Sequence, residues 1–182
     1  MKRKKRGQVW IETVLYSLIG LALIGVALAI ITPKINASKD RLVVEQTIDS
    51  LNIIDLKIVE LLDRGQANVR IIDEFSIKKG ELYFNANEDK IIFVIDDLSK
   101  PYSTPGEIIK KNNVEIISEE GNKNSKVFLT LDYAGVLNLT YVEGLNNLGV
   151  KKITPAAIAY AFRLENKGIE NDLDVIEFSE RS

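Results

Sequence analysis

The sequence predicts an α+β protein, in which a long N-terminal helix is followed by an antiparallel β-sheet or β-sandwich head domain. Three observations support this fold class. Residues 13–33 carry no formal charge and are rich in Leu, Ile, Val, Ala and Gly. Residues 38–64 repeat apolar side chains at helical spacing, and residues 66–182 contain short apolar runs separated by turn residues.

The uncharged run is long enough to cross a membrane. As a helix, residues 13–33 would rise roughly 30 Å, about the thickness of a hydrocarbon core. The basic residues 2–6 precede it, which predicts a cytoplasmic N-terminus and an extracellular C-terminal domain. Gly25 and Ala29 stand four residues apart and would let a second helix approach closely. Pro33 is expected to kink or interrupt the helix, because it lacks a backbone N–H.

Two ordinary interpretations compete for this segment. A plain signal anchor accounts for the span but leaves Glu12 unexplained, since an unpaired carboxylate in lipid costs about 2–3 kcal/mol. A secretory signal peptide would be cut after Ala29, because residues 27–29 have the small-x-small form that leader peptidases prefer. The apolar run continues through Ile30 and Ile31, which argues against that cut.

A third interpretation rests on the residues before the span, which read Arg6-Gly-Gln-Val-Trp-Ile-Glu12. This stretch resembles the class III signal peptide of archaeal type IV pilin-like proteins and archaellins. The resemblance covers roughly residues 1–35 and implies that a prepilin peptidase cuts between Gly7 and Gln8. Glu12 would then be the fifth residue, where the family carries its glutamate. Trp10 stands where the family usually has serine, and Tyr16 where it usually has leucine.

The resemblance also implies a role for Glu12. The cut would free an α-amino group with a pKa near 8, and in a filament this ammonium would pair with the Glu12 carboxylate of a neighbouring subunit and set the register between them. In an unassembled precursor Glu12 would instead remain hydrated at the membrane surface. The predicted division is a basic leader (1–7), a transmembrane or assembly helix (8–33), an amphipathic continuation (34–65) and an extracellular β domain (66–182).

The amphipathic part is predicted from apolar residues at steps of three and four, with charged residues between them. These residues are Val44, Ile48, Leu51, Ile54, Ile58 and Leu62. Gly65 supplies a left-handed stop. A continuous or kinked helix over about 8–64 would be roughly 85 Å long.

The remainder is predicted to be all β. The expected strands cover residues 69–77, 81–85, 90–96, 114–118, 126–132, 136–142, 157–165 and 173–178. The expected turns lie at 79–80, 87–89, 120–122, 134–135 and 167–168, and residues 101–106 are expected to form an exposed loop. Alternation places Ile158, Tyr160, Phe162 and Leu164 on one face of a strand.

Composition argues against an enzyme. The chain has no histidine and no cysteine, so His-based catalysis, thiol chemistry and the usual zinc sites are not expected. The acidic pairs at 73–74, 88–89, 96–97 and 119–120 are interpreted as solvated turns, and no cofactor or metal is expected. Asn85, Asn87 and Asp89 have the spacing of calcium ligands, but the loop lacks the required glycine and distal glutamate.

Charge separates the two parts of the chain. Five of the 24 basic residues lie in residues 1–7, so the rest carries 19 basic and 26 acidic residues, a formal charge of −7. That surface would repel a nucleic-acid backbone, and no nucleic acid is expected as a partner. Two sequons beyond the span, at Asn36 and Asn138, are candidates for N-glycosylation.

The sequence therefore predicts a pilin-like, single-pass membrane protein. It would be processed by a prepilin peptidase and assembled, with further copies or other pilin-like subunits, into a type IV pilus-like filament for adhesion or surface display. One alternative is a nonpolymerising single-span protein or minor pilin whose β head binds an extracellular partner. Another is a binding module secreted after cleavage at Ala29.

Overall fold

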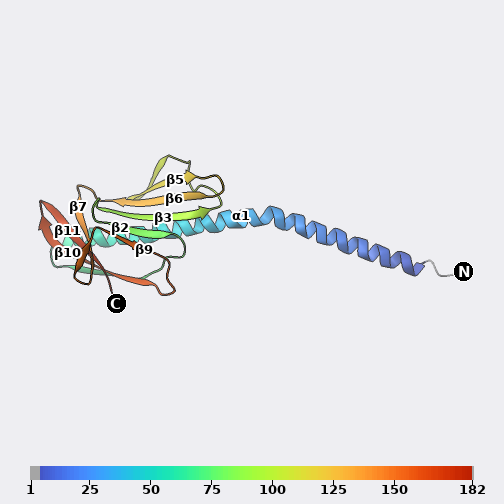
Figure 1. The fold of residues 1–182 in the computed structure, drawn as a ribbon, viewed down its shortest axis with the longest axis horizontal. Coiled ribbons are helices and arrows are strands. Elements are labelled where there is room, and N and C mark those ends of the chain that lie inside the picture. The colour runs from blue at the N-terminus through green and yellow to red at the C-terminus, as the bar shows by residue number, and fades with distance from the viewer. Residues whose placement is uncertain (1–4, 182) are drawn as a thin grey trace. The chain divides into compact units, whose positions relative to one another are not determined.

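A computed structural model describes the backbone of residues 5–181 and the side chains of residues 10–181. It confirms the α+β fold class, with one long N-terminal helix followed by two sheets (Figure 1). The chain divides into two compact units, residues 1–39 and residues 40–182. The helix α1 (Lys5–Arg64) contributes residues to both units.

The predicted ends of the helix are close to those observed. It continues through Pro33, so the proline does not interrupt it. A proline inside a helix removes one backbone hydrogen bond, and the long helical segments on either side, apolar before it and amphipathic after it, favour continuing the helix. The helix ends where Gly65 adopts a φ of 75° and its N–H donates to the carbonyl of Leu61 at 3.0 Å. This is the predicted left-handed stop.

The second unit contains two sheets. The five-stranded sheet has the order β1-β10-β11-β7-β8, and the six-stranded sheet has the order β4-β5-β6-β3-β2-β9. Neighbouring strands are antiparallel, except that β11 runs parallel to β7. The bounds are β1 (Val69–Phe75), β2 (Glu81–Asn85), β3 (Lys90–Leu98), β4 (Ile108–Lys111), β5 (Val114–Glu120), β6 (Ser125–Asp132), β7 (Leu137–Glu143), β8 (Asn146–Leu148), β9 (Val150–Ile153), β10 (Tyr160–Glu170) and β11 (Leu173–Glu180).

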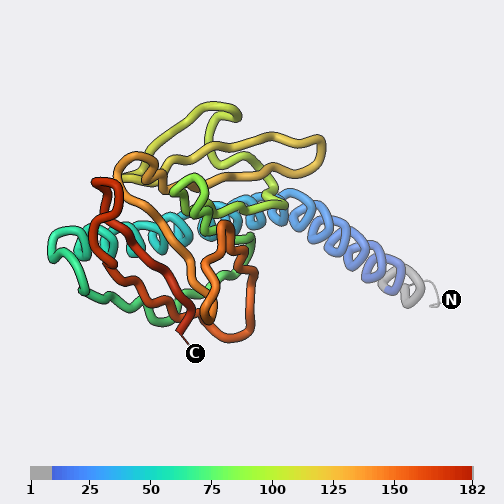
Figure 2. Tube along the Cα trace, turned by 60° about the vertical axis from the view of Figure 1, so that its left-hand side comes forward, coloured from blue at the N-terminus to red at the C-terminus, as the bar shows by residue number. Residues whose placement is uncertain are grey.

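Both sheets pack on the C-terminal part of α1. In two views the green and yellow strands β3, β5 and β6 run along one side of residues 40–64, while the red strands β10 and β11 lie on another (Figures 1 and 2). One hydrophobic core joins the three layers. Its helix residues are buried at steps of three and four, and they are Val44, Ile48, Leu51, Ile54, Ile58 and Leu61. Leu61, rather than the expected Leu62, completes this stripe, and Leu62 is half-buried beside it.

Three strands were absent from the sequence-based assignment, namely β4, β8 and β9. Each is three or four residues long. β4 and β9 contain two adjacent lysines each, and charge of this kind is common at sheet edges, where β4 and β9 lie. Short charged edge strands lack the apolar alternation on which the prediction depended.

Two details around β10 correct the sequence-based assignment. The turn predicted at residues 167–168 is a β-bulge inside β10, where the register against β11 shifts and Gly168 has a φ of 101°. The chain turns instead at Asn171 and Asp172, both with positive φ. Ile158 lies before the start of β10 and is 83% exposed. The neighbouring strand β1 ends at Phe75, opposite Tyr160, so it offers no partner for the residues that precede Tyr160.

Candidate functional site: the N-terminal helix

The helical segment in the first unit exposes its apolar side chains. Every large apolar residue from Trp10 to Ile35 is exposed, including Tyr16 at 71% and Leu21 at 73%. This helix is long and apolar enough to cross a membrane. Side chains that water does not solvate must meet lipid or another protein surface. The exposure of the whole segment therefore marks it as the candidate functional surface of this chain.

Polar groups within the segment are satisfied locally. The hydroxyl of Ser17 donates to the carbonyl of Thr13 at 2.8 Å, and the hydroxyl of Thr32 donates to the carbonyl of Leu28 at 2.7 Å. Such bonds to the preceding turn remove the need for water at these hydroxyls. They suit a helix placed in lipid or in a protein core.

Small residues leave open space on the same segment. A Cβ added at Gly20 or Gly25 would meet no atom within 4 Å. Gly25 and Ala29 lie on one face of the helix, since residues four apart are neighbours. The described chain thus leaves an unfilled strip where another helix can approach closely.

The predicted processing and register residues lie near the start of α1. The backbone of Gly7 and Gln8 is helical, and the side chain of Gln8 lies outside the described residues, as does the whole of residues 1–4. Glu12 is an exposed residue of the helix. The three residues thus lie along one helix.

The second unit carries an additional apolar surface on α1. Leu42, Ile53, Leu56 and Val59 are between 43% and 61% exposed. The helical repeat places Leu42, Ile53 and Leu56 on the side of the helix away from the buried stripe, and Val59 between the two sides. We call these four residues the outer stripe.

A polar cluster fixes the helix to the loop at 101–106. The hydroxyl of Tyr102 donates to Oε1 of Glu45 at 2.7 Å, and Nζ of Lys111 donates to Oε2 of Glu45 at 2.5 Å. These hydrogen bonds, first that from Lys111, lower the pKa of the Glu45 carboxyl below its usual value. Burial raises the pKa of the Tyr102 hydroxyl. The cluster holds Tyr102 against α1, so residues 101–103 of the predicted exposed loop are half-buried and only residues 104–106 are exposed.

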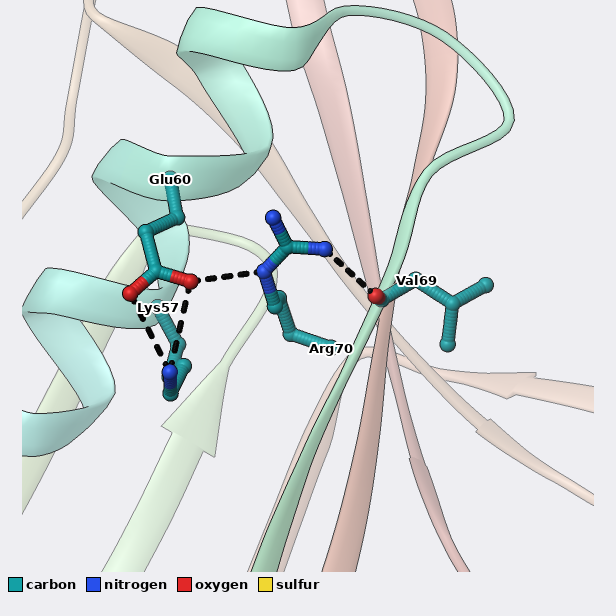
Figure 3. A network of polar contacts seen from close by, with 4 residues as sticks. All are labelled: Lys57, Glu60, Val69 and Arg70. Atoms are coloured by element: carbon teal, nitrogen blue, oxygen red, sulfur yellow. Dashed lines mark hydrogen bonds and ion pairs between the residues drawn. The ribbon is translucent and has the colours of Figure 1, made fainter.

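A second cluster fixes the end of the helix to β1 (Figure 3). Nε of Arg70 donates to Oε2 of Glu60 at 2.6 Å, and Nζ of Lys57 donates to Oε1 of the same carboxylate at 3.1 Å. Arg70 also donates to the carbonyl of Val69 at 2.9 Å. The Arg70 hydrogen bond, followed by that from Lys57, lowers the pKa of the Glu60 carboxyl. Both clusters hold the outer stripe in a defined orientation.

The two sequons differ in their surroundings. Asn36 is exposed on α1 in the first unit. Asn138 is half-buried in β7, and its Nδ2 donates to the carbonyl of Glu170 at 3.3 Å. Its neighbours Leu137 and Leu139 are buried. Because side chains alternate between the two faces of a strand, the side chain of Asn138 points away from the core.

The acidic pairs do not form a metal site in the part of the chain that the structure describes. No group of three or more Asp or Glu side chains there is placed to hold an ion. Asp96 pairs with Lys126 at 3.0 Å, and Asp97 accepts a hydrogen bond from Asn124.

Sequence reasoning missed one charged residue that is buried on the core side of the helix. Asp55 is 7% exposed and accepts hydrogen bonds from Tyr133 and Asn113. Burial and the neighbouring Asp55 raise the pKa of the Tyr133 hydroxyl well above its usual value. The sequence does indicate that Asp55 is buried, since Asp55 follows Leu51 by four residues and so falls within the apolar stripe.

Comparisons with protein-family models, with curated proteins and with solved structures return no match. The functional conclusion therefore depends on the residues and geometry described above.

Proposed function

We propose that this chain is a structural, non-enzymatic pilin-like subunit. In this proposal a prepilin peptidase removes residues 1–7 at the membrane. The exposed helix then packs with those of other copies in a type IV pilus-like filament, which displays the β head at the cell surface for adhesion or display.

The outer stripe is the observation that carries the proposal. A plain anchor accounts for exposed apolar residues in a membrane span, but not for Ile53 and Leu56, which lie at least 20 residues beyond the uncharged run. The head does not need them, because its core is closed by the opposite side of the helix. An assembly helix uses both segments, since its neighbours cover the span and the outer stripe alike.

Glu12 supports the same proposal. It stands at the edge of an apolar helix, at the fifth position after the predicted cut. The α-ammonium produced by a cut before Gln8 would be attracted to the Glu12 carboxylate of a neighbouring copy. The resemblance of residues 6–12 to class III signal peptides adds to this argument.

The test compares two helix variants in an archaeal host that has an active prepilin peptidase. We expect Glu12→Gln to be trimmed normally and to reduce the yield of sheared filaments, seen by electron microscopy, at least tenfold. Ser17→Ala is the matched control, since Ser17 is also polar and exposed on the helix, and it should leave the yield unchanged.

Filaments of normal yield from trimmed Glu12→Gln would contradict the register role. A wild-type chain that stays monomeric in the membrane would contradict assembly. That second result would favour the alternative, a nonpolymerising membrane protein or minor pilin whose head binds an extracellular partner.

A further inference from the structure

A hollow of about 330 Å³ lies beside the helix in the second unit, between α1, the β4–β5 turn and the segment that follows β6. Asp55 lines it and is 7% exposed. Val59, Leu62 and Val136 supply apolar walls. We call this cavity the Asp55 hollow.

The carboxylate of Asp55 has only neutral partners. Tyr133 donates to Oδ1 at 2.8 Å and Asn113 donates to Oδ2 at 2.7 Å. Among residues 10–181, Asp55 forms no ion pair, whereas the nearby Lys110 is neutralised by Glu115 at 2.7 Å. A buried carboxylate is normally paired with a cation, because desolvation of an uncompensated charge is unfavourable. Lys110, the one lysine or arginine among the residues that line the hollow, is thus already paired, and the Asp55 carboxylate is left without a cation.

The walls indicate which kind of cation fits. Val136 is 62% exposed and Val59 is 43% exposed, so apolar surface leads from solvent to the carboxylate. A hydrated metal ion gains nothing from such walls, whereas an alkyl chain ending in an ammonium group would bury its methylenes there. A lysine side chain has this form.

The position of the hollow indicates where the lysine comes from. Val59 belongs both to the hollow and to the outer stripe, so the site is continuous with the surface proposed for assembly. The chain itself offers suitable groups: Lys100 and Lys123 are exposed, and neither forms an ion pair among the described residues. We propose that the Asp55 hollow binds a lysine side chain of a second copy. This inference rests on the proposed function.

The first experiment tests the chemistry of the site without requiring assembly. The full chain in detergent micelles is titrated with n-butylammonium and, separately, with n-butanol, while NMR follows the side-chain amide of Asn113. We expect n-butylammonium to shift this signal with a dissociation constant of about 1–10 mM, in keeping with so small a ligand. The neutral alcohol should bind at least tenfold more weakly.

Variants assign the effect to one carboxylate. Asp55→Asn keeps the shape of the side chain and should weaken n-butylammonium binding at least tenfold. Asp49→Asn, on the exposed side of the same helix, is the matched control and should change it less than twofold. Equal binding of amine and alcohol, no binding of either, or unchanged binding by Asp55→Asn would each overturn the inference. The comparison of amine with alcohol uses the wild-type chain and so holds even if Asp55→Asn does not fold.

The second experiment identifies the source of the amine. Filaments made from mixed ¹⁴N- and ¹⁵N-labelled copies are treated with a carbodiimide, which couples carboxylates to amines in contact, and the cross-linked peptides are identified by mass spectrometry. We expect Asp55 joined to a lysine, with light and heavy isotopes combined in one product. Filaments without such a link would overturn the inference and leave the proposed function intact. Copies that do not associate would overturn the proposed function and the second-copy assignment together, while the butylammonium titration would still decide the chemistry of the hollow.

Discussion

The orientation of α1 in the head can be tested with two adjacent isoleucines. Ile54 is fully buried in the core, whereas Ile53 is 50% exposed in the outer stripe. The same substitution, isoleucine to alanine, can therefore be made one residue apart on one helix. The two variants differ only in which side of the helix loses its methylenes.

The expected losses differ severalfold. Ile54→Ala removes three buried carbons, worth about 2.4 kcal/mol by transfer, and leaves a cavity that brings the total to about 3–4 kcal/mol. Ile53→Ala removes about half as much buried surface and leaves no enclosed cavity. Alanine also favours the helix by a few tenths of a kcal/mol, so the net loss should be below about 1 kcal/mol.

Thermal unfolding of the full chain in micelles, followed by near-ultraviolet circular dichroism of the buried Tyr133 and Tyr141, measures both variants. For a unit of this size about 1 kcal/mol corresponds to about 2–4 °C. We expect the midpoint to fall by about 10 °C for Ile54→Ala and by less than about 4 °C for Ile53→Ala. Equal shifts, or a larger shift for Ile53→Ala, would refute the assignment of the buried and outer sides of the helix.

Three further predictions concern the head. In urea unfolding, Gly80→Ala should destabilise the head by about 2 kcal/mol or more beyond the loss caused by Gly135→Ala. Both glycines have positive φ, but only a Cβ at Gly80 would collide with the backbone oxygen of Val94. Equal losses of stability in the two variants would count against this packing. Because the pKa of Glu60 is lowered in the folded state, its contribution is present above its unfolded pKa of about 4.3 and is lost as the pH falls through its folded value. Glu60→Gln should therefore flatten the fall of the thermal midpoint below pH 4.5, and an unchanged slope would argue that the Arg70 contact contributes nothing. Tyr102→Phe should speed amide hydrogen exchange in residues 101–106 while leaving β10 unaffected, since it removes the bond to Glu45; unchanged exchange in the loop would show that the hydroxyl does not hold it.

The helix was predictable because its signals are local. The uncharged run, the repeat from Val44 to Ile58 and the stop at Gly65 each depend on neighbouring residues, and the structure agrees with them apart from the exchange of Leu61 for Leu62. Strands with apolar alternation were predicted for the same reason, as β2 and β6 illustrate.

Features that depend on distant partners were not predictable. The parallel pairing of β7 with β11 joins segments whose order cannot be read from either sequence. Ile158 has the alternation of a strand residue but no strand beside it. The burial of Asp55 follows from its place in the apolar stripe, but its partners Tyr133 and Asn113 come from distant segments and could not be predicted. The outer stripe was hidden for a similar reason, since only the position of the core shows which side of the helix the head leaves uncovered.

In the proposed function, trimming residues 1–7 converts the N-terminal helix into an assembly element. The most direct test is the intact mass of the chain recovered from the membranes of a host with an active prepilin peptidase. We expect the mass of a chain that begins at Gln8. A mass that begins at Met1, in cells where the peptidase processes its other substrates, would contradict it.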